Sequence, residues 1–348
     1  MPTDSVFCRF ASVIRLLKLP RLQTLLLSFF SLALLAITVA AQQTITNQQS
    51  ETLRARYEAA QAFARAENWA AAEAEWRQAL KIAPEDARAW VNLGVSLNRQ
   101  GKTTEAIEAW TKAAKLDPKL AGAHFNLGLA LVRNNQFAEA IKPLRSALLL
   151  QPANEAARRA LALAYIGTER FAEGSREIAR LLSRAPRDAF LLELAADCFM
   201  RQQRYGEAVT VLKRRLDFGN GTGRLWALFG DALDGEGRTP EAADAYQRAV
   251  DLAPESTVTR YGLGYLYWKL YRYPEAEREL IEVLRRDPNE ARAAFTLGDL
   301  YLTRHEAKRA LPFLEQAVRA YPEEFDTHFA LGRALMQTGE TEHAIEKF

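Results

Sequence analysis

A small residue recurs every 34 positions along most of this 348-residue chain. Five short stretches end in it as glycine: WVNLG (90–94), HFNLG (124–128), WALFG (226–230), AFTLG (294–298) and HFALG (328–332). When the chain is divided into blocks of 34 from Leu53, the eighth position is glycine or alanine in every block. A strict period of this length predicts a series of similar structural units, each packed on its neighbours.

Three further positions of the block keep one type of residue. Position 20 is alanine or glycine, position 24 is large and mainly apolar, and position 32 is proline except at Asn220. Positions 4, 7, 8 and 11 share one face of a helix, and positions 20, 24 and 27 share a face of a second helix. Small residues at 8 and 20 would let the two helices approach closely. Proline at 32 is predicted to stop the second helix and to start the next one.

The recurring glycine is therefore predicted to serve packing. A phosphate-binding glycine would need a loop between a strand and a helix, and these glycines lie within a helical period.

The block resembles the tetratricopeptide repeat, whose pattern is W-x2-L-G-x2-Y, then A-x3-F, then P. The second block carries the pattern in Trp90, Leu93, Gly94, Leu97, Ala106, Trp110, Ala113 and Pro118. The resemblance implies an all-α fold, a superhelical solenoid of antiparallel helix pairs with a concave groove that holds ligands. It covers residues 53–348, as the repeats 53–86, 87–120, 121–154, 155–188, 189–222, 223–256, 257–290, 291–324 and a partial repeat at 325–348.

The first 41 residues differ from the rest. Four basic residues precede an uncharged apolar run at 25–41, and a polar spacer at 42–52 follows, which we expect to be a linker. This order is typical of a signal peptide cleaved before Gln42, or of a retained anchor that contacts the membrane through residues 22–41. In both cases the positively charged N-terminal flank predicts export of the repeats to a periplasm or to the cell exterior.

Charge argues against binding to nucleic acid. Residues 42–348 carry 42 basic and 42 acidic residues, whereas nonspecific nucleic-acid binding needs an excess of positive charge. The charge is uneven along the chain: residues 42–222 have a net charge of +6, and residues 223–348 have a net charge of −6.

The sequence gives no support for catalysis, a metal or a cofactor, and we expect the chain not to be an enzyme. His124 and His328 occupy position 4, where other blocks have tryptophan, so they are predicted to pack, and no two histidines have the spacing of zinc ligands. Beyond Cys8 in the leader there is one cysteine, Cys198, which excludes a disulfide framework and is predicted to be structural.

The resemblance implies that positions 2, 5, 6, 9, 12 and 13 of each first helix line the groove. The candidate residues there are Arg88, Asn92, Arg99, Asn126, Arg133, Tyr261, Tyr265, Trp268 and Phe295. Amides can bond to a peptide backbone, guanidinium groups to carboxylates, and aromatic rings to apolar side chains. A second interpretation stays open, since arginines are common on helix surfaces and some of these rings could pack between repeats.

The pattern predicts a scaffold that binds a protein or peptide partner in its groove. Two alternatives remain. The repeats could be the docking or sensing arm of a larger enzyme or of a secretion or envelope-assembly complex, because the pattern stops at Phe348 within a predicted helix. The aromatic residues could also bind glycans in the cell envelope.

Overall fold

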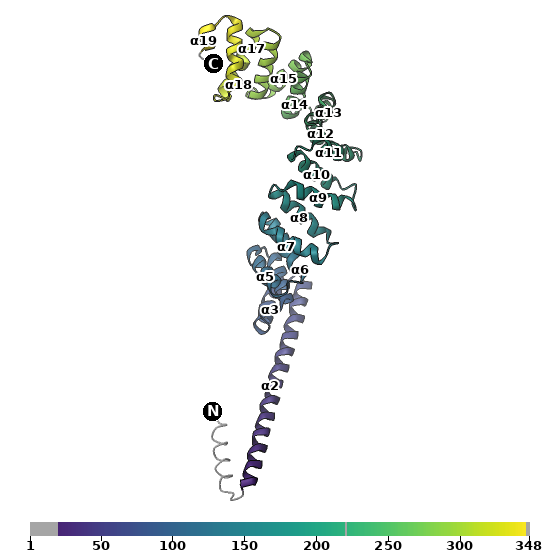
Figure 1. The fold of residues 1–348 in the computed structure, drawn as a ribbon, viewed down its shortest axis with the longest axis vertical. Helices are drawn as coiled ribbons and strands as arrows, with labels where there is room; N and C mark the ends of the chain where they lie inside the picture. The colour runs from purple at the N-terminus through teal and green to yellow at the C-terminus, as the bar shows by residue number, and fades with distance from the viewer. Residues whose placement is uncertain (1–19, 220, 346–348) are drawn as a thin grey trace. The chain divides into compact units, whose positions relative to one another are not determined.

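The computed structural model describes residues 20–219 and 221–345, apart from the side chains of residues 20–27, 30 and 45. All regular secondary structure in these residues is helical (Figure 1). The helices are α2 (Pro20–Arg65), α3 (Trp69–Ile82), α4 (Ala87–Arg99), α5 (Thr103–Leu116), α6 (Ala121–Arg133), α7 (Phe137–Leu150), α8 (Glu155–Gly167), α9 (Phe171–Leu182), α10 (Ala189–Arg201), α11 (Tyr205–Leu216), α12 (Gly223–Gly235), α13 (Thr239–Leu252), α14 (Thr257–Lys269), α15 (Tyr273–Arg286), α16 (Ala291–Thr303), α17 (Ala307–Ala320), α18 (Phe325–Thr338) and α19 (Thr341–Ile345).

Each 34-residue block contains two helices joined by a short turn. In the second block, residues 100–102 join α4 to α5, so the second helix folds back on the first. The same arrangement recurs in the other blocks, with even-numbered helices first and odd-numbered helices second. The predicted all-helical fold of repeated helix pairs is confirmed for the described residues.

The chain divides into two compact units. Unit 1 is Met1–Ala153, whose described helices are α2 to α7, and unit 2 is Asn154–Phe348, which holds α8 to α19. Each unit has its own buried core, built mainly from alanine, leucine and aromatic residues. The sequence pattern predicted one unbroken series of repeats, and its period gives no sign of this division.

The glycine at position 8 makes room for the large side chain at position 24 of the same repeat. A Cβ atom added to Gly128 would lie 2.5 Å from Cγ of Leu144, and one added to Gly94 would lie 2.5 Å from Nε1 of Trp110. Real Cβ atoms do not approach other atoms so closely, because interiors are close-packed. The prediction that this glycine serves packing is confirmed.

The prolines at position 32 stop the second helix but do not start the next one. Pro84 lies in the loop after α3, and α4 begins three residues later at Ala87. The start of α4 is set instead by Asp86, whose Oδ1 accepts hydrogen bonds from the backbone N–H groups of Arg88 and Ala89. A polar side chain at this position satisfies N–H groups that have no partner within the helix.

Position 15, in the turn between the two helices of a repeat, adopts a left-handed backbone in every block. The φ angles there lie between 56° and 89°. Glycine tolerates this conformation, but most of these residues are not glycine: Glu67, Gly101, Asn135, Glu169, Gln203, Gly237, Tyr271, His305 and Gly339. The sequence did not reveal this requirement because the residue type at position 15 is not constant.

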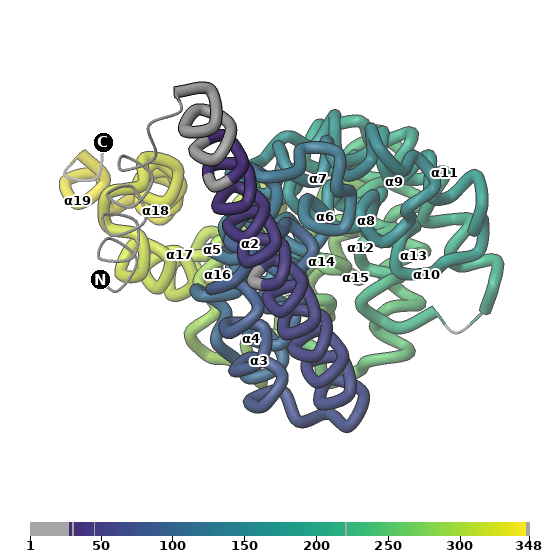
Figure 2. Tube along the Cα trace, turned by 90° about the horizontal axis from the view of Figure 1, so that it is seen from below, coloured from purple at the N-terminus to yellow at the C-terminus, as the bar shows by residue number. Residues whose placement is uncertain are grey.

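The spacer at 42–52, which we expected to be a linker, is helical. Helix α2 runs through it from Pro20 to Arg65 (Figure 2). No proline or glycine interrupts residues 21–65, and the hydroxyl groups of Thr44 and Thr52 donate to carbonyl groups four residues earlier. Extending a helix costs less than nucleating one, so the last turns of α2, which pack on α3, provide the nucleus.

Part of the predicted leader, residues 1–19, lies outside the described residues. Among residues whose side chains the structure describes, no helix is both long enough and apolar enough to cross a membrane.

We expect Gly128→Ala to destabilise unit 1 by about 1–3 kcal/mol, because the added methyl group overpacks against Leu144. Gly122→Ala is a matched control on the same helix, since a Cβ there meets no atom within 4 Å. Urea unfolding of both variants measures the difference. Equal midpoints for the two variants would contradict the packing role of Gly128.

We expect Gln203→Gly to raise stability by about 1 kcal/mol. Glycine removes the strain of about 1–2 kcal/mol that a left-handed backbone imposes on other residues. It also costs about 0.5–1 kcal/mol of stability, because it has more conformational freedom in the unfolded chain. Gln203→Ala, which keeps the strain at φ 56°, should show no gain. Thermal unfolding of the two variants tests this, and a gain with alanine as large as with glycine would show that strain is not the cause.

Candidate functional site

Three of the candidate residues meet at one cleft in unit 1. The cleft has a volume of about 470 Å³ and lies between the first helices of the second and third repeats, α4 and α6. We call it the arginine cleft; its lining residues are Val95, Asn98, Arg99, Trp110, Asn126, Leu129, Ala130 and Arg133. The candidates Arg99, Asn126 and Arg133 stand at its rim, and sequence reasoning missed Asn98 and the apolar floor.

The floor of the arginine cleft includes Trp110, which comes from the second helix of its repeat. Because Gly94 has no side chain, the indole passes close to α4, and its Nε1 donates to the carbonyl oxygen of Val91 at 3.1 Å. The sequence identified Trp110 as a core residue by its position in the block. Its indole is 3% exposed, so it contributes both to the core and to the cleft.

The polar groups of the cleft have few partners within the protein. Neither Arg99 nor Arg133 forms an ion pair with any described residue, and the side-chain amides of Asn98 and Asn126 make no hydrogen bond to described groups. The Arg99 guanidinium lies 5.5 Å from the centre of the Trp69 ring. Unpaired guanidinium and amide groups can bind a carboxylate or the backbone of an extended segment.

Two further candidates in unit 1 lie away from this cleft. Arg88 is exposed in the first turn of α4, and Asn92 is half-buried on the same helix. Asn92 occupies the position in α4 that Asn126 occupies in α6. The structure does not bring Arg88 and Asn92 together with the other three.

The aromatic candidates of unit 2 form a stack along α14. The ring centres of Tyr261 and Tyr265 are 6.2 Å apart, and those of Tyr265 and Trp268 are 5.5 Å apart, with interplanar angles of 29° and 27°. We call these three residues the aromatic ladder. Residues spaced by three or four share a helix face, and Tyr265 remains 37% exposed. Phe295 on α16 joins Tyr261 in lining a pocket of about 160 Å³.

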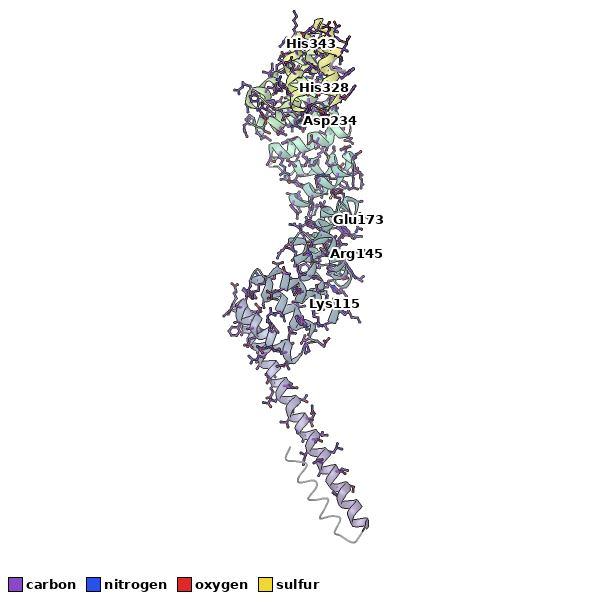
Figure 3. The ribbon with its side chains drawn as sticks, turned by 90° about the vertical axis from the view of Figure 1, so that its left-hand side faces the viewer. Lys115, Arg145, Glu173, Asp234, His328 and His343 are labelled. Atoms are coloured by element: carbon purple, nitrogen blue, oxygen red, sulfur yellow. The ribbon has the colours of Figure 1, made fainter. Side chains whose placement is uncertain are left out.

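Polar contacts tie the aromatic ladder to the neighbouring helices. Lys269 on α14 places its ammonium 2.6 Å from Oδ1 of Asp234 on α12, which Figure 3 labels, and 5.9 Å from the centre of the Tyr265 ring. On the other side, the Trp268 side chain lies close to the carboxyl group of Asp299 on α16. The first helices α12, α14 and α16 therefore present one connected surface.

Histidines at position 4 are structural. Nε2 of His124 lies 3.0 Å from the carbonyl oxygen of Pro118, and Nε2 of His328 lies 2.9 Å from that of Pro322. Trp90 makes the equivalent bond through its indole N–H to Pro84, which confirms the prediction that these histidines pack. No group of three or more histidine, cysteine or acidic residues in the described part of the chain could hold a metal ion.

The remaining thiol is buried. Cys198 is 0% exposed on α10, and burial, aided by the charge of Asp197, raises its pKa to about 11. A nucleophilic cysteine needs a lowered pKa and access to solvent, so this thiol is structural, as predicted.

Sequence profiles now settle the family. Two profiles described as tetratricopeptide repeat match the chain, one at residues 57–121, 99–158 and 295–348 and the other at residues 131–192 and 235–298. The chain belongs to the tetratricopeptide repeat family. Repeats of this family mediate protein–protein interaction, and their fold is generally a scaffold without catalytic machinery. A search of curated proteins finds no match.

Three solved structures are similar to this chain. YrrB, described as a TPR protein with an unusual peptide-binding site, is 23% identical, with a TM-score of 0.38 over 64% of this chain and 96% of YrrB. A tetratricopeptide repeat protein from Parabacteroides merdae is 16% identical, with a TM-score of 0.45 over 72% and 99% of the two chains. MamA (MSR-1 C2) is 22% identical, with a TM-score of 0.42 over 46% and 92%.

Proposed function

We propose that this protein is an exported scaffold that holds a segment of a partner protein against the inner faces of its first helices. The inner face of a first helix is the face formed by positions 2, 5, 6, 9, 12 and 13 of the repeat. The arginine cleft carries the proposal, because it combines unpaired donors with an apolar floor. Arg99 and Arg133 offer charge to carboxylates, while Asn98 and Asn126 offer amides to a peptide backbone. A partner segment would satisfy groups that the protein itself leaves without bonds.

The spacing of the arginines favours an extended acidic segment in unit 1. Position 13 is arginine in each of the first three repeats, at Arg65, Arg99 and Arg133, and none of them forms an ion pair with a described residue. Directly packed helices lie about 10 Å apart, and an extended chain advances about 3.3 Å per residue. The first helices α2, α4 and α6 alternate with second helices. One step along the arginines therefore corresponds to at least about three residues, so we propose acidic side chains three or more positions apart in the segment.

Export is the second part of the proposal, and it rests on the leader sequence. The basic flank and the apolar run at 25–41 support passage of residues beyond 42 across a membrane. We expect repeats in a periplasm to be protected from protease in intact cells and cut once the outer barrier is opened, and repeats at the cell exterior to be cut in intact cells. Mass spectrometry of the same protein distinguishes a chain that begins at Gln42 from one that keeps the leader. Repeats found in the cytosolic fraction would contradict export.

The groove is tested by site-specific photocrosslinking in cells that make the full chain. A benzophenone side chain at Asn126 is expected to capture one partner, whereas the same group at Lys115, exposed on the second helix α5, should capture none. Figure 3 labels Lys115. The double variant Arg99→Ala and Arg133→Ala should reduce capture at Asn126 tenfold or more, because charge-assisted hydrogen bonds contribute about 1.5–3 kcal/mol each.

The outcome at the two positions decides the proposal. Equal capture at Lys115 and at Asn126 would show that the inner face has no special role. Unchanged capture in the double arginine variant would show that the arginine cleft is not the site, whatever protein is captured.

A further inference from the structure

Asp231 stands on the inner face of α12 in an arrangement specific to the sixth repeat. Tyr246, at position 24 of this repeat, passes between two glycines, Gly230 and Gly262, and its hydroxyl donates to Oδ1 of Asp231 at 2.5 Å. A Cβ atom on either glycine would collide with the Tyr246 ring. Gly230 is the usual glycine of position 8, whereas Gly262 stands at position 6 of the next repeat.

The charge of Asp231 is not neutralised by the protein. The side chain is exposed, its bond from Tyr246 comes from a neutral hydroxyl, and no described cation forms an ion pair with it. The surrounding protein removes part of the water around the carboxylate and raises its pKa, to which nearby Asp234 adds. A cation from outside would stabilise the ionised form.

The next carboxylate on the same helix, Asp234, already binds a cation at this surface. Asp234 binds the ammonium of Lys269, and that ammonium also lies near the face of Tyr265 in the aromatic ladder. A carboxylate and a tyrosine ring thus share one lysine within this protein. Asp231 and Tyr265 hold the same position, position 9, in adjacent repeats, so they border the same groove one helix apart.

Carboxylates flank the aromatic ladder on both sides. Asp231 and Asp234 lie on α12 before it, and Asp299 lies on α16 after it. Burial raises the pKa of the Asp299 carboxyl group, although a guanidinium nitrogen of Arg333 on α18 lies 4.0 Å from its Oδ1. Residues 223–348 as a whole carry a net charge of −6. Complementary charge favours a positively charged partner segment and disfavours an acidic one.

We propose that the inner face of α12, α14 and α16 binds a basic protein segment, with a lysine or arginine paired to Asp231 and its aliphatic stem on the aromatic ladder. Lysine and arginine combine a charged head with an apolar stem, and the face of a tyrosine ring attracts a cation placed over it. This inference rests on the proposed groove function and adds the charge of the segment that unit 2 selects.

The test uses the full chain and three fluorescein-labelled peptides of twelve residues that are identical except at every third position. One peptide carries lysine there, the second Nε-acetyl-lysine and the third glutamate. We expect the lysine peptide to bind at least tenfold more tightly than its acetylated twin, as measured by fluorescence anisotropy. Equal binding of the two would overturn the inference, because acetylation removes the charge and keeps the stem.

Variants locate the binding of the lysine peptide. Asp231→Asn should weaken it about tenfold, and Tyr265→Leu, which keeps an apolar side chain and removes the ring, should weaken it several-fold. Glu255→Gln, an exposed carboxylate in the loop before α14, is the matched control and should leave the affinity unchanged. An equal loss with Glu255→Gln would show nonspecific attraction to an acidic protein and would overturn the site.

The inference and the proposed function fail in different ways. A benzophenone at Tyr265 can capture a partner whose attached peptide, read by mass spectrometry, has no lysine or arginine. That result would overturn the basic segment while the groove function stands. The lysine peptide can also bind in a way that needs Asp231 while a benzophenone at Asn126 captures no partner. That pair of results would support the site in unit 2 and contradict the scaffold proposal for unit 1.

Discussion

The contact between position 8 and position 24 of each repeat is the constraint on which the rest of the structure depends. A glycine at position 8 lets the large side chain from the second helix lie directly against the first helix, as Leu144 does against Gly128. In the first, fourth and fifth repeats position 8 is alanine, and its small side chain is fully buried. A small residue at this position is therefore needed in every block.

The same packing rule also shapes the inner surface. In the second repeat the residue at position 24 is Trp110, and the room left by Gly94 carries its indole to the floor of the arginine cleft. In the sixth repeat it is Tyr246, which reaches the inner face and holds Asp231. Core packing and surface chemistry are thus linked through one pair of positions. Repeats with leucine at position 24 have no polar group there to offer.

Much of the fold follows from local and periodic information. Position 8 of each block must be small, and position 24, sixteen residues later, must be large. Both requirements recur in every repeat of the sequence, so the helix pairs could be predicted from them. The turn at position 15 could not, because its left-handed backbone is imposed by the packing of the two helices and is adopted even by Tyr271 and His305. The helical spacer at 42–52 was missed for another reason: its polar sequence shows no amphipathic period, yet it extends a helix that is nucleated in the first repeat.

The sequence by itself determined the repeat, the helical fold, the packing role of the glycines and the face on which Arg99, Asn126 and Arg133 lie, since these depend on spacing along one chain. The tertiary structure decided which candidates meet and which groups keep a free charge. Arg88 and Arg99 look alike in sequence, but only Arg99 lines the cleft with Arg133. Asp234 and Asp231 stand one turn apart, but only Asp234 receives a lysine from the next repeat. Ion pairing between repeats depends on distances between helices, and residue order does not contain those distances.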